Sequence, residues 1–113
     1  MLVGIHQPHY LPWLRYFEKI ARVDVFIALD TVQYNKNGWQ NRNRIKTANG
    51  PLLLTVPVHA NLGQAIETVA VRESEPWRLK HARSIEQAYR KAPYFVRYWD
   101  MLRAAYDRPW TLL

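Results

Sequence analysis

The chain has 113 residues, a formal net charge of +7 and no cysteine. Its 49% hydrophobic composition, with five Trp and seven Tyr, argues against disorder, and its length predicts one domain over residues 1–113. The missing cysteines exclude disulfides and thiolate metal sites. Because the N-terminus lacks the long apolar run of a signal peptide or membrane span, we expect a cytoplasmic protein without membrane insertion.

The first elements predicted are a strand, a helix and a second strand. Residues 2–6 form a short apolar run. From Pro12 to Arg22 the apolar positions follow helical spacing, and they are Trp13, Leu14, Phe17, Ile20 and Ala21. Residues 25–29 are continuously apolar, which is typical of a strand covered on both faces. This order predicts a βαβ unit with parallel strands and a right-handed connection.

The rest of the chain predicts a hairpin and two helices. Residues 40–46 and 52–58 are expected to pair as a hairpin around the turn signal Asn49–Gly50, and residues 66–71 to supply a further strand. One helix opens at Pro76 with the stripe Trp77, His81, Ala82, Ile85 and Tyr89, and a last helix covers about 93–106 with Phe95, Tyr98, Trp99 and Leu102 on one side. The fold class is therefore α/β, a parallel βαβ start followed by a hairpin and two C-terminal helices.

The C-terminal stretch "DRPWTLL" ends on an apolar group directly after a helix stop. Free termini are usually polar and frayed. We therefore expect this chain to be the N-terminal part of a longer protein. Trp110, Leu112 and Leu113 should then leave apolar surface, which favours self-association into a homo-oligomer.

Two polar loops follow the predicted parallel strands, residues 6–10 and residues 30–34. Ligands in parallel sheets bind at the carboxyl ends of the strands, and the helix N-terminus near Pro12 suits a phosphate there. Beyond these loops, a basic run carries Lys36, Arg42, Arg44 and Lys46 among aromatic and amide residues. Arginine pairs two-pronged with phosphate, and Trp39 is placed to stack on a base or sugar. The alternative is that Arg42 and Arg44 form only a solvated cationic face.

The basic charge itself has two interpretations. It indicates phosphate-bearing partners, either nucleotides, nucleotide-sugars or nucleic acid, or it serves only solubility. His6 and His9 lack a third ligand, so no metal is expected, and His81 on its helix stripe is read as a packing residue. A Ser-His-Asp order, a Walker loop and a glycine-rich dinucleotide motif are all missing from the sequence.

The string "QPHYLPWLRYFEKI", with the later "DVFIALDTVQYNKNGWQNRNRIK" and "LTVPV", resembles the WbqC-like family of bacterial proteins. Many members belong to gene clusters for surface polysaccharides, and members are typically about twice as long as this chain. The resemblance is densest from Gln7 to Val58. It implies a site built from Gln7, Tyr10, Asp30, Lys36, Asn41 and Arg42. His6 and His9 stand where relatives vary, and Arg15 stands where relatives usually have glycine.

The layout is also similar, more faintly, to nucleotidyltransferases with a DPxHxGH-type signature. Tyr10 and Trp13 would take the two histidine places. Under that resemblance, phosphate stabilisation would come from Gln7, the helix N-terminus, Lys36 and Arg42.

These features predict a cytoplasmic transferase acting on a nucleotide-linked sugar or similar phosphorylated small molecule in surface-polysaccharide synthesis. In this reading Gln7 orients the ligand, Tyr10 offers its hydroxyl and ring, and Asp30 acts as general base or binds a ribose or amine. The expected substrate-binding residues are His6, His9, Gln33, Tyr34, Lys36, Trp39, Asn41, Arg42 and Asn43. A nucleic-acid-binding module and a non-catalytic assembly subunit stay open as alternatives, and the sequence names no cofactor.

Overall fold

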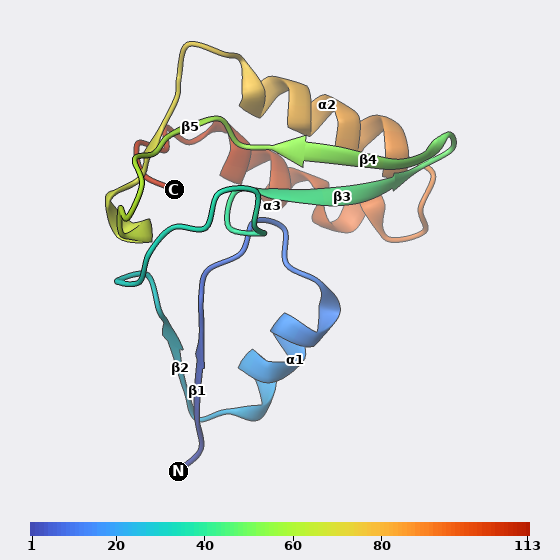
Figure 1. The fold of residues 1–113 in the computed structure, drawn as a ribbon. Helices are drawn as coiled ribbons and strands as arrows, with labels where there is room; N and C mark the ends of the chain where they lie inside the picture. The colour runs from blue at the N-terminus through green and yellow to red at the C-terminus, as the bar shows by residue number, and fades with distance from the viewer.

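The computed structural model describes residues 1–113 and places an N-terminal βαβ unit beside a larger part built from a hairpin and two helices (Figure 1). Its elements in chain order are β1 (Val3–His6), α1 (Leu14–Arg22), β2 (Val25–Ala28), β3 (Arg42–Thr47), β4 (Gly50–Thr55), β5 (Val58–His59), the 3₁₀ helix η1 (Ile66–Thr68), β6 (Ala70–Val71), α2 (Trp77–Tyr89) and α3 (Phe95–Asp107). The mixed α/β order expected from the sequence is confirmed. None of the helices combines the length and the apolar character needed to cross a membrane.

The strands of the βαβ unit are parallel, as predicted. β1 and β2 pair in register from Val3 opposite Val25 to His6 opposite Ala28. α1 connects them and begins at Leu14, two residues after Pro12. It covers one face of the pair, where the ring of Tyr16 lies 5.6 Å from that of Phe26.

Two details of the βαβ unit differ from expectation. The helix does not turn its apolar stripe to the sheet, since Tyr16 is its only buried residue and Leu14 is 86% exposed. The helix approaches over Gly4, where an added Cβ would lie 3.0 Å from the side chain of Val23. β2 is also not covered on both faces, because no element of this chain lies on the side opposite α1.

The hairpin is confirmed with shifted bounds. β3 and β4 pair antiparallel from Arg42 opposite Thr55 to Thr47 opposite Gly50. The turn is therefore Ala48–Asn49, one residue earlier than expected. Gly50 begins β4 with φ of +105°, a conformation that residues with a Cβ rarely adopt, so glycine is needed directly after the turn.

The strand expected at residues 66–71 is largely wrong. Residues 66–68 form the 3₁₀ helix η1, and β6 has two residues, which pair antiparallel with β5. A 3₁₀ turn places residues three apart on one side. Accordingly Ile66 and Val69 are both 0% exposed and pack with Tyr34. The C-terminal residues join the same sheet, since the Val71 amide donates to the Thr111 carbonyl at 2.9 Å.

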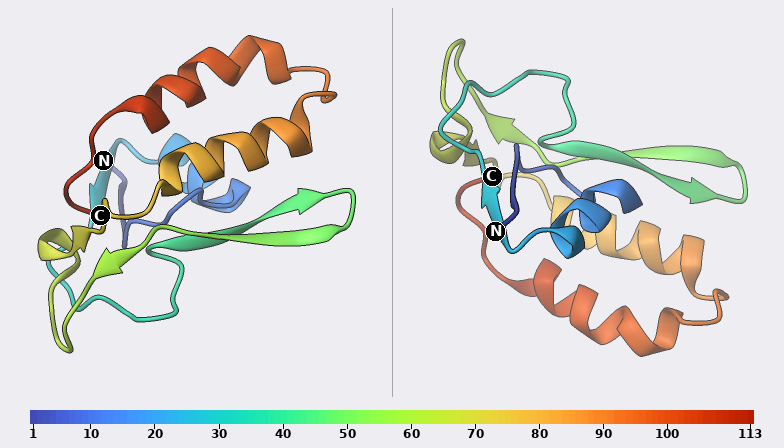
Figure 2. Two further views of the ribbon diagram at one scale, coloured as in Figure 1. Left: turned by 90° about the horizontal axis from the view of Figure 1, so that it is seen from above. Right: turned by 90° about the horizontal axis from the view of Figure 1, so that it is seen from below.

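The main core lies between the hairpin and the two C-terminal helices, which lie on one face of it with α2 nearer (Figure 2). It contains Ile45, Leu54, Val56, Val71, Trp77, Ala82, Ile85 and Tyr106. The predicted α2 stripe is confirmed, because Trp77, His81 and Ile85 are all buried. The prediction for α3 is only partly right, because Tyr98, expected on the packed side of the helix, is 51% exposed.

Candidate functional site: a cationic cavity beside the hairpin

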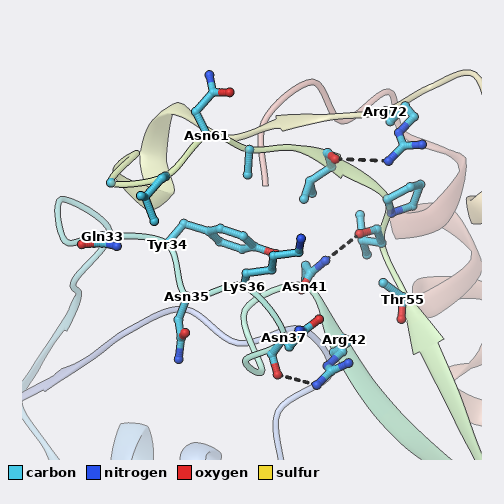
Figure 3. A pocket seen from close by; sticks show the side chains of 16 residues that line it. Gln33, Tyr34, Asn35, Lys36, Asn37, Asn41, Arg42, Thr55, Asn61 and Arg72 are labelled. Carbon is cyan, nitrogen blue, oxygen red and sulfur yellow. Dashed lines mark hydrogen bonds between the residues drawn. The ribbon is translucent and has the colours of Figure 1, made fainter.

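A cavity of about 740 Å³ opens between residues 33–37, the start of β3 and the segment that runs from the end of β4 past β5 (Figure 3). Most of the residues that line it are polar. The polar lining residues are Gln33, Tyr34, Asn35, Lys36, Asn37, Asn41, Arg42, Thr55, Asn61 and Arg72. The cavity therefore has the size and the hydrogen-bonding groups of a small-molecule site.

The cavity is cationic. Lys36, Arg42 and Arg72 line it, and no Asp or Glu does. Neither Lys36 nor Arg42 forms a salt bridge, whereas Arg72 has a long one of 3.5 Å to Glu75. Uncompensated positive charge in a concave, partly desolvated site concentrates anions. The charged residues that line the cavity are thus all cationic.

Local contacts hold the cavity wall in place. One terminal nitrogen of the Arg42 guanidinium donates to the carbonyl of Asn37, which itself has φ of +65°. The Asn41 amide donates to the Val56 carbonyl at 3.0 Å and so ties the start of β3 to the end of β4. The Nε of Arg42 and the Oδ1 of Asn41 are buried without a partner. The wall is rigid but not saturated in its hydrogen bonds.

Tyr34 and Lys36 project into the cavity, whereas Gln33, Asn35 and Asn61 point away from it (Figure 3). Burial raises the pKa of the Tyr34 hydroxyl, and the charge of Arg42 offsets part of that rise. The hydroxyl is therefore protonated at neutral pH and is a hydrogen-bond donor. The phenol of Tyr34 and the ammonium of Lys36 therefore face the cavity, while the guanidinium groups of Arg42 and Arg72 lie at its wall, bonded to the carbonyls of Asn37 and Val58.

The first polar loop, together with the residues up to the start of α1, lies outside the cavity and is hydrogen-bonded to residues 39–43. The side chain of Gln40 donates to that of Gln7 at 2.9 Å. The Asn43 amide donates to the Leu11 carbonyl at 2.8 Å, and Leu11 has an unusual positive φ of 44°. The Tyr10 amide donates to the Trp39 carbonyl at 3.0 Å. These bonds give the loop a role in the scaffold.

The family model of the WbqC-like protein family matches residues 7–113. The chain belongs to the WbqC-like protein family. It is also similar to the uncharacterized protein Rv1507c of Mycobacterium tuberculosis, with 41% identity over 106 residues. That match covers 92% of this chain and 46% of the relative, so the chain spans about half the relative's length. No solved structure matches the chain.

The fold of this WbqC-like chain divides the residues expected at one site into two groups. The first group lines the cavity and consists of Gln33, Tyr34, Lys36, Asn41 and Arg42. The second group does not line the cavity and consists of His6, Gln7, His9, Tyr10, Asp30, Trp39 and Asn43. The expected pocket that unites Gln7, Tyr10 and Asp30 with Lys36 and Arg42 is not formed. The first loop instead lies outside the cationic cavity, hydrogen-bonded to residues 39–43.

Four of the residues outside the cavity make contacts elsewhere in the fold. The Asp30 carbonyl accepts the Glu67 amide at 2.9 Å, which anchors η1. The Trp39 ring lies 5.9 Å from the Arg44 guanidinium. His6 and His9 contact each other edge to face, with ring centroids 4.8 Å apart. None of these contacts involves a residue that lines the cavity.

Sequence reasoning missed Arg72, Thr55 and Asn61 on the far side of the cavity. Arg72 follows directly after β6, and the pairing of β6 with β5 brings it opposite residues 57–58. The only local signal was a cation after the apolar stretch "VAV". Its placement depends on a long-range strand pair that the sequence did not predict.

His81 is a buried packing residue, as expected, and its hydrogen bonds define its tautomer. Its Nε2 lies 3.1 Å from the Thr55 carbonyl, so this nitrogen carries the proton and donates it. Its Nδ1 lies 2.7 Å from the Tyr10 hydroxyl and accepts from it, while the Tyr106 hydroxyl donates to the Tyr10 oxygen. Burial lowers the pKa of His81 and raises those of both tyrosines. The cluster is therefore neutral.

This neutral histidine predicts a loss of stability at mildly acidic pH. Burial holds the pKa of His81 below its usual value, while an unfolded chain takes up that proton near pH 6.5. The unfolded state then binds more protons, so the free energy of unfolding falls as pH decreases below about 6.5. One proton contributes at most about 1.4 kcal/mol per pH unit. Urea unfolding between pH 5.5 and 7.5 measures this slope.

A histidine variant separates the contributions to that slope. The pKa of His9 is also below its usual value, because burial and the nearby His6 both lower it. His81→Gln should therefore reduce the dependence of the unfolding free energy on pH. His9→Gln should keep the share of that dependence that His81 contributes. An unchanged slope in His81→Gln would show that the buried histidine does not control the pH dependence.

Proposed function

We propose that this chain binds a phosphorylated small molecule, with a nucleotide-linked sugar as the leading candidate, in the cationic cavity. One observation carries the proposal: Lys36, Arg42 and Arg72 line one cavity that no carboxylate enters. The wider context proposed is a cytoplasmic transferase of bacterial surface-polysaccharide synthesis, which rests on the family resemblance.

The chemistry of the lining suits phosphate groups. A guanidinium binds two phosphate oxygens side by side, and an ammonium adds a compact point charge. The protonated Tyr34 hydroxyl supplies a further donor. The volume of about 740 Å³ lies within the range of small-ligand pockets, which favours a compact anion over an extended nucleic acid strand.

The proposed role in transfer is stabilisation of the leaving group. Transfer of a sugar from a nucleoside diphosphate leaves added negative charge on the diphosphate oxygens. Cations fixed near those oxygens lower the barrier because the charge develops beside them. The cavity holds no carboxylate or histidine to act as general base, so the proposal assigns phosphate binding to this chain and the base to a group outside the cavity.

A thermal-shift screen tests the binding proposal. The probes are UDP, GDP, UDP-glucose and inorganic pyrophosphate, with uridine and glucose as uncharged controls. A ligand at a hundred times its Kd stabilises the folded state by about 2.7 kcal/mol. We expect at least one phosphorylated probe to raise the Tm and the uncharged controls to leave it unchanged.

Lys36→Ala should reduce that shift, and Lys46→Ala is the matched control, because Lys46 lies on the same basic run outside the cavity. If no phosphorylated probe raises the Tm, the proposal is wrong. A larger shift with short DNA or RNA, weakening steeply with salt, would favour the nucleic-acid-binding alternative.

A further inference from the structure

The βαβ unit leaves one face of its sheet uncovered. Val3 lies directly opposite Val25, and Ile5 lies opposite Ile27. These four residues, which we call the outer sheet face, alternate with Gly4 and Phe26, which face α1. Ile5 is 53% exposed and the other three are 43% exposed. The outer sheet face is thus a continuous aliphatic surface with nothing of this chain on it.

Such a face is unusual for parallel strands. Parallel sheets occur almost only with both faces covered, and a two-stranded sheet is too small to be stable without packing. Both strands are apolar at the outward positions, as a strand between two layers requires. The amino-acid choice therefore fits a covered face better than one in contact with water.

A second copy of this chain is a poor cover. Full burial of an aliphatic side chain removes roughly 60–120 Å² from water, so four half-exposed side chains offer on the order of 200 Å². Stable interfaces bury about 800 Å² on each partner. The outer sheet face is too small to hold any two chains together by itself, so the polypeptide that covers it must make further contacts beside it.

The WbqC-like relative supplies a better candidate. This chain covers 46% of it, so more than half of that relative's polypeptide lies outside the match. The element that normally covers a parallel sheet is an amphipathic helix. We propose that the outer sheet face is the docking surface for the polypeptide that the relative carries outside the matched region, through an amphipathic helix of that polypeptide. This inference is independent of the proposed ligand.

The chain allows a specific test because it contains no cysteine. Ile27→Cys places one thiol on the outer sheet face, and Leu62→Cys, at a residue 101% exposed in the loop between β5 and η1, is the control. Each variant carries an environment-sensitive dye and is mixed with the part of Rv1507c that lies outside the match. We expect a blue shift of the emission for Ile27→Cys and none for Leu62→Cys.

Affinity provides a second measurement. Ile27→Glu should weaken the complex at least about tenfold, because binding would bury an unpaired carboxylate. Leu62→Glu should bind as the parent chain does. Since Ile27 is exposed in the free chain, circular dichroism and Tm of Ile27→Glu should match those of the parent. Absence of a complex, or equal binding by Ile27→Glu, overturns the proposal. A blue shift of the labelled chain alone that grows with its concentration would assign the face to a second copy instead.

Discussion

Trp77→Ala is expected to destabilise the fold by about 3–5 kcal/mol, the usual cost of removing a large aromatic side chain from a core. Trp77 is 6% exposed, and its ring lies 5.4 Å from that of His81 and 6.4 Å from that of Tyr106. It therefore connects the start of α2 to the end of α3. Because small domains are stable by about 5–15 kcal/mol, this loss is a large share of the total. Urea denaturation followed by tyrosine and tryptophan fluorescence measures it.

Trp13→Ala is the matched control, since Trp13 is 62% exposed beside α1. Exposed substitutions usually change stability by no more than about 0.5 kcal/mol. If Trp77→Ala costs less than about 1 kcal/mol, the packing between α2 and α3 contributes little to folding. Equal losses in both variants would show that the outer surface near Trp13 is buried in solution.

The parts of the fold that the sequence predicted are those fixed by local pattern. The parallel βαβ start, the hairpin and the α2 stripe follow from periodicity and turn residues close together in the chain. The hairpin turn lies one residue earlier than the Asn49–Gly50 signal predicts, because Thr47 pairs with Gly50 and leaves Ala48–Asn49 as the turn. Residues 66–71 predict a strand because a buried 3₁₀ turn, like a strand, places apolar residues at short spacing.

The direction of side chains and the partners of each face could not be predicted. The apolar stripe of α1 predicts that this stripe packs against the sheet. Instead, the Tyr16 ring packs against Phe26, and the missing Cβ of Gly4 lets Val23 lie close to β1. The continuous apolar run of β2 predicted cover on both faces, whereas the structure of this chain covers only the face toward α1.

The candidate site was predicted in part, for a physical reason. Tyr34, Lys36 and Arg42 belong to one polar segment, so composition alone placed them together. Composition does not say whether an amide faces a ligand or a backbone carbonyl. The side chain of Asn43 donates to the Leu11 carbonyl, where the backbone has an unusual positive φ, and it does not line the cavity. Arg72 reaches the cavity only through the pairing of β5 with β6.

Arg42→Ala is expected to weaken binding of a phosphorylated ligand such as UDP by about 1.5–3 kcal/mol, the value of a hydrogen bond to a charged group. That loss corresponds to roughly a ten- to hundredfold increase in Kd. Arg42→Lys should restore only part of the affinity, because an ammonium cannot bind two phosphate oxygens in the fork geometry of a guanidinium. Isothermal titration calorimetry with the ligand found by thermal shift measures the three Kd values.

Arg44→Ala is the control for removing a cation from β3 outside the cavity. Arg44 lies two residues further along β3, is exposed, and does not line the cavity. Its affinity should match that of the parent chain. Arg42 also donates to the Asn37 carbonyl, so unfolding of each variant by urea must accompany the titrations. A neutral hydrogen bond contributes about 0.5–1.5 kcal/mol, which sets the loss of stability expected from Arg42→Ala. If affinity is unchanged while stability falls by more than that, Arg42 holds the loop and the phosphate-binding role belongs to Lys36 and Arg72.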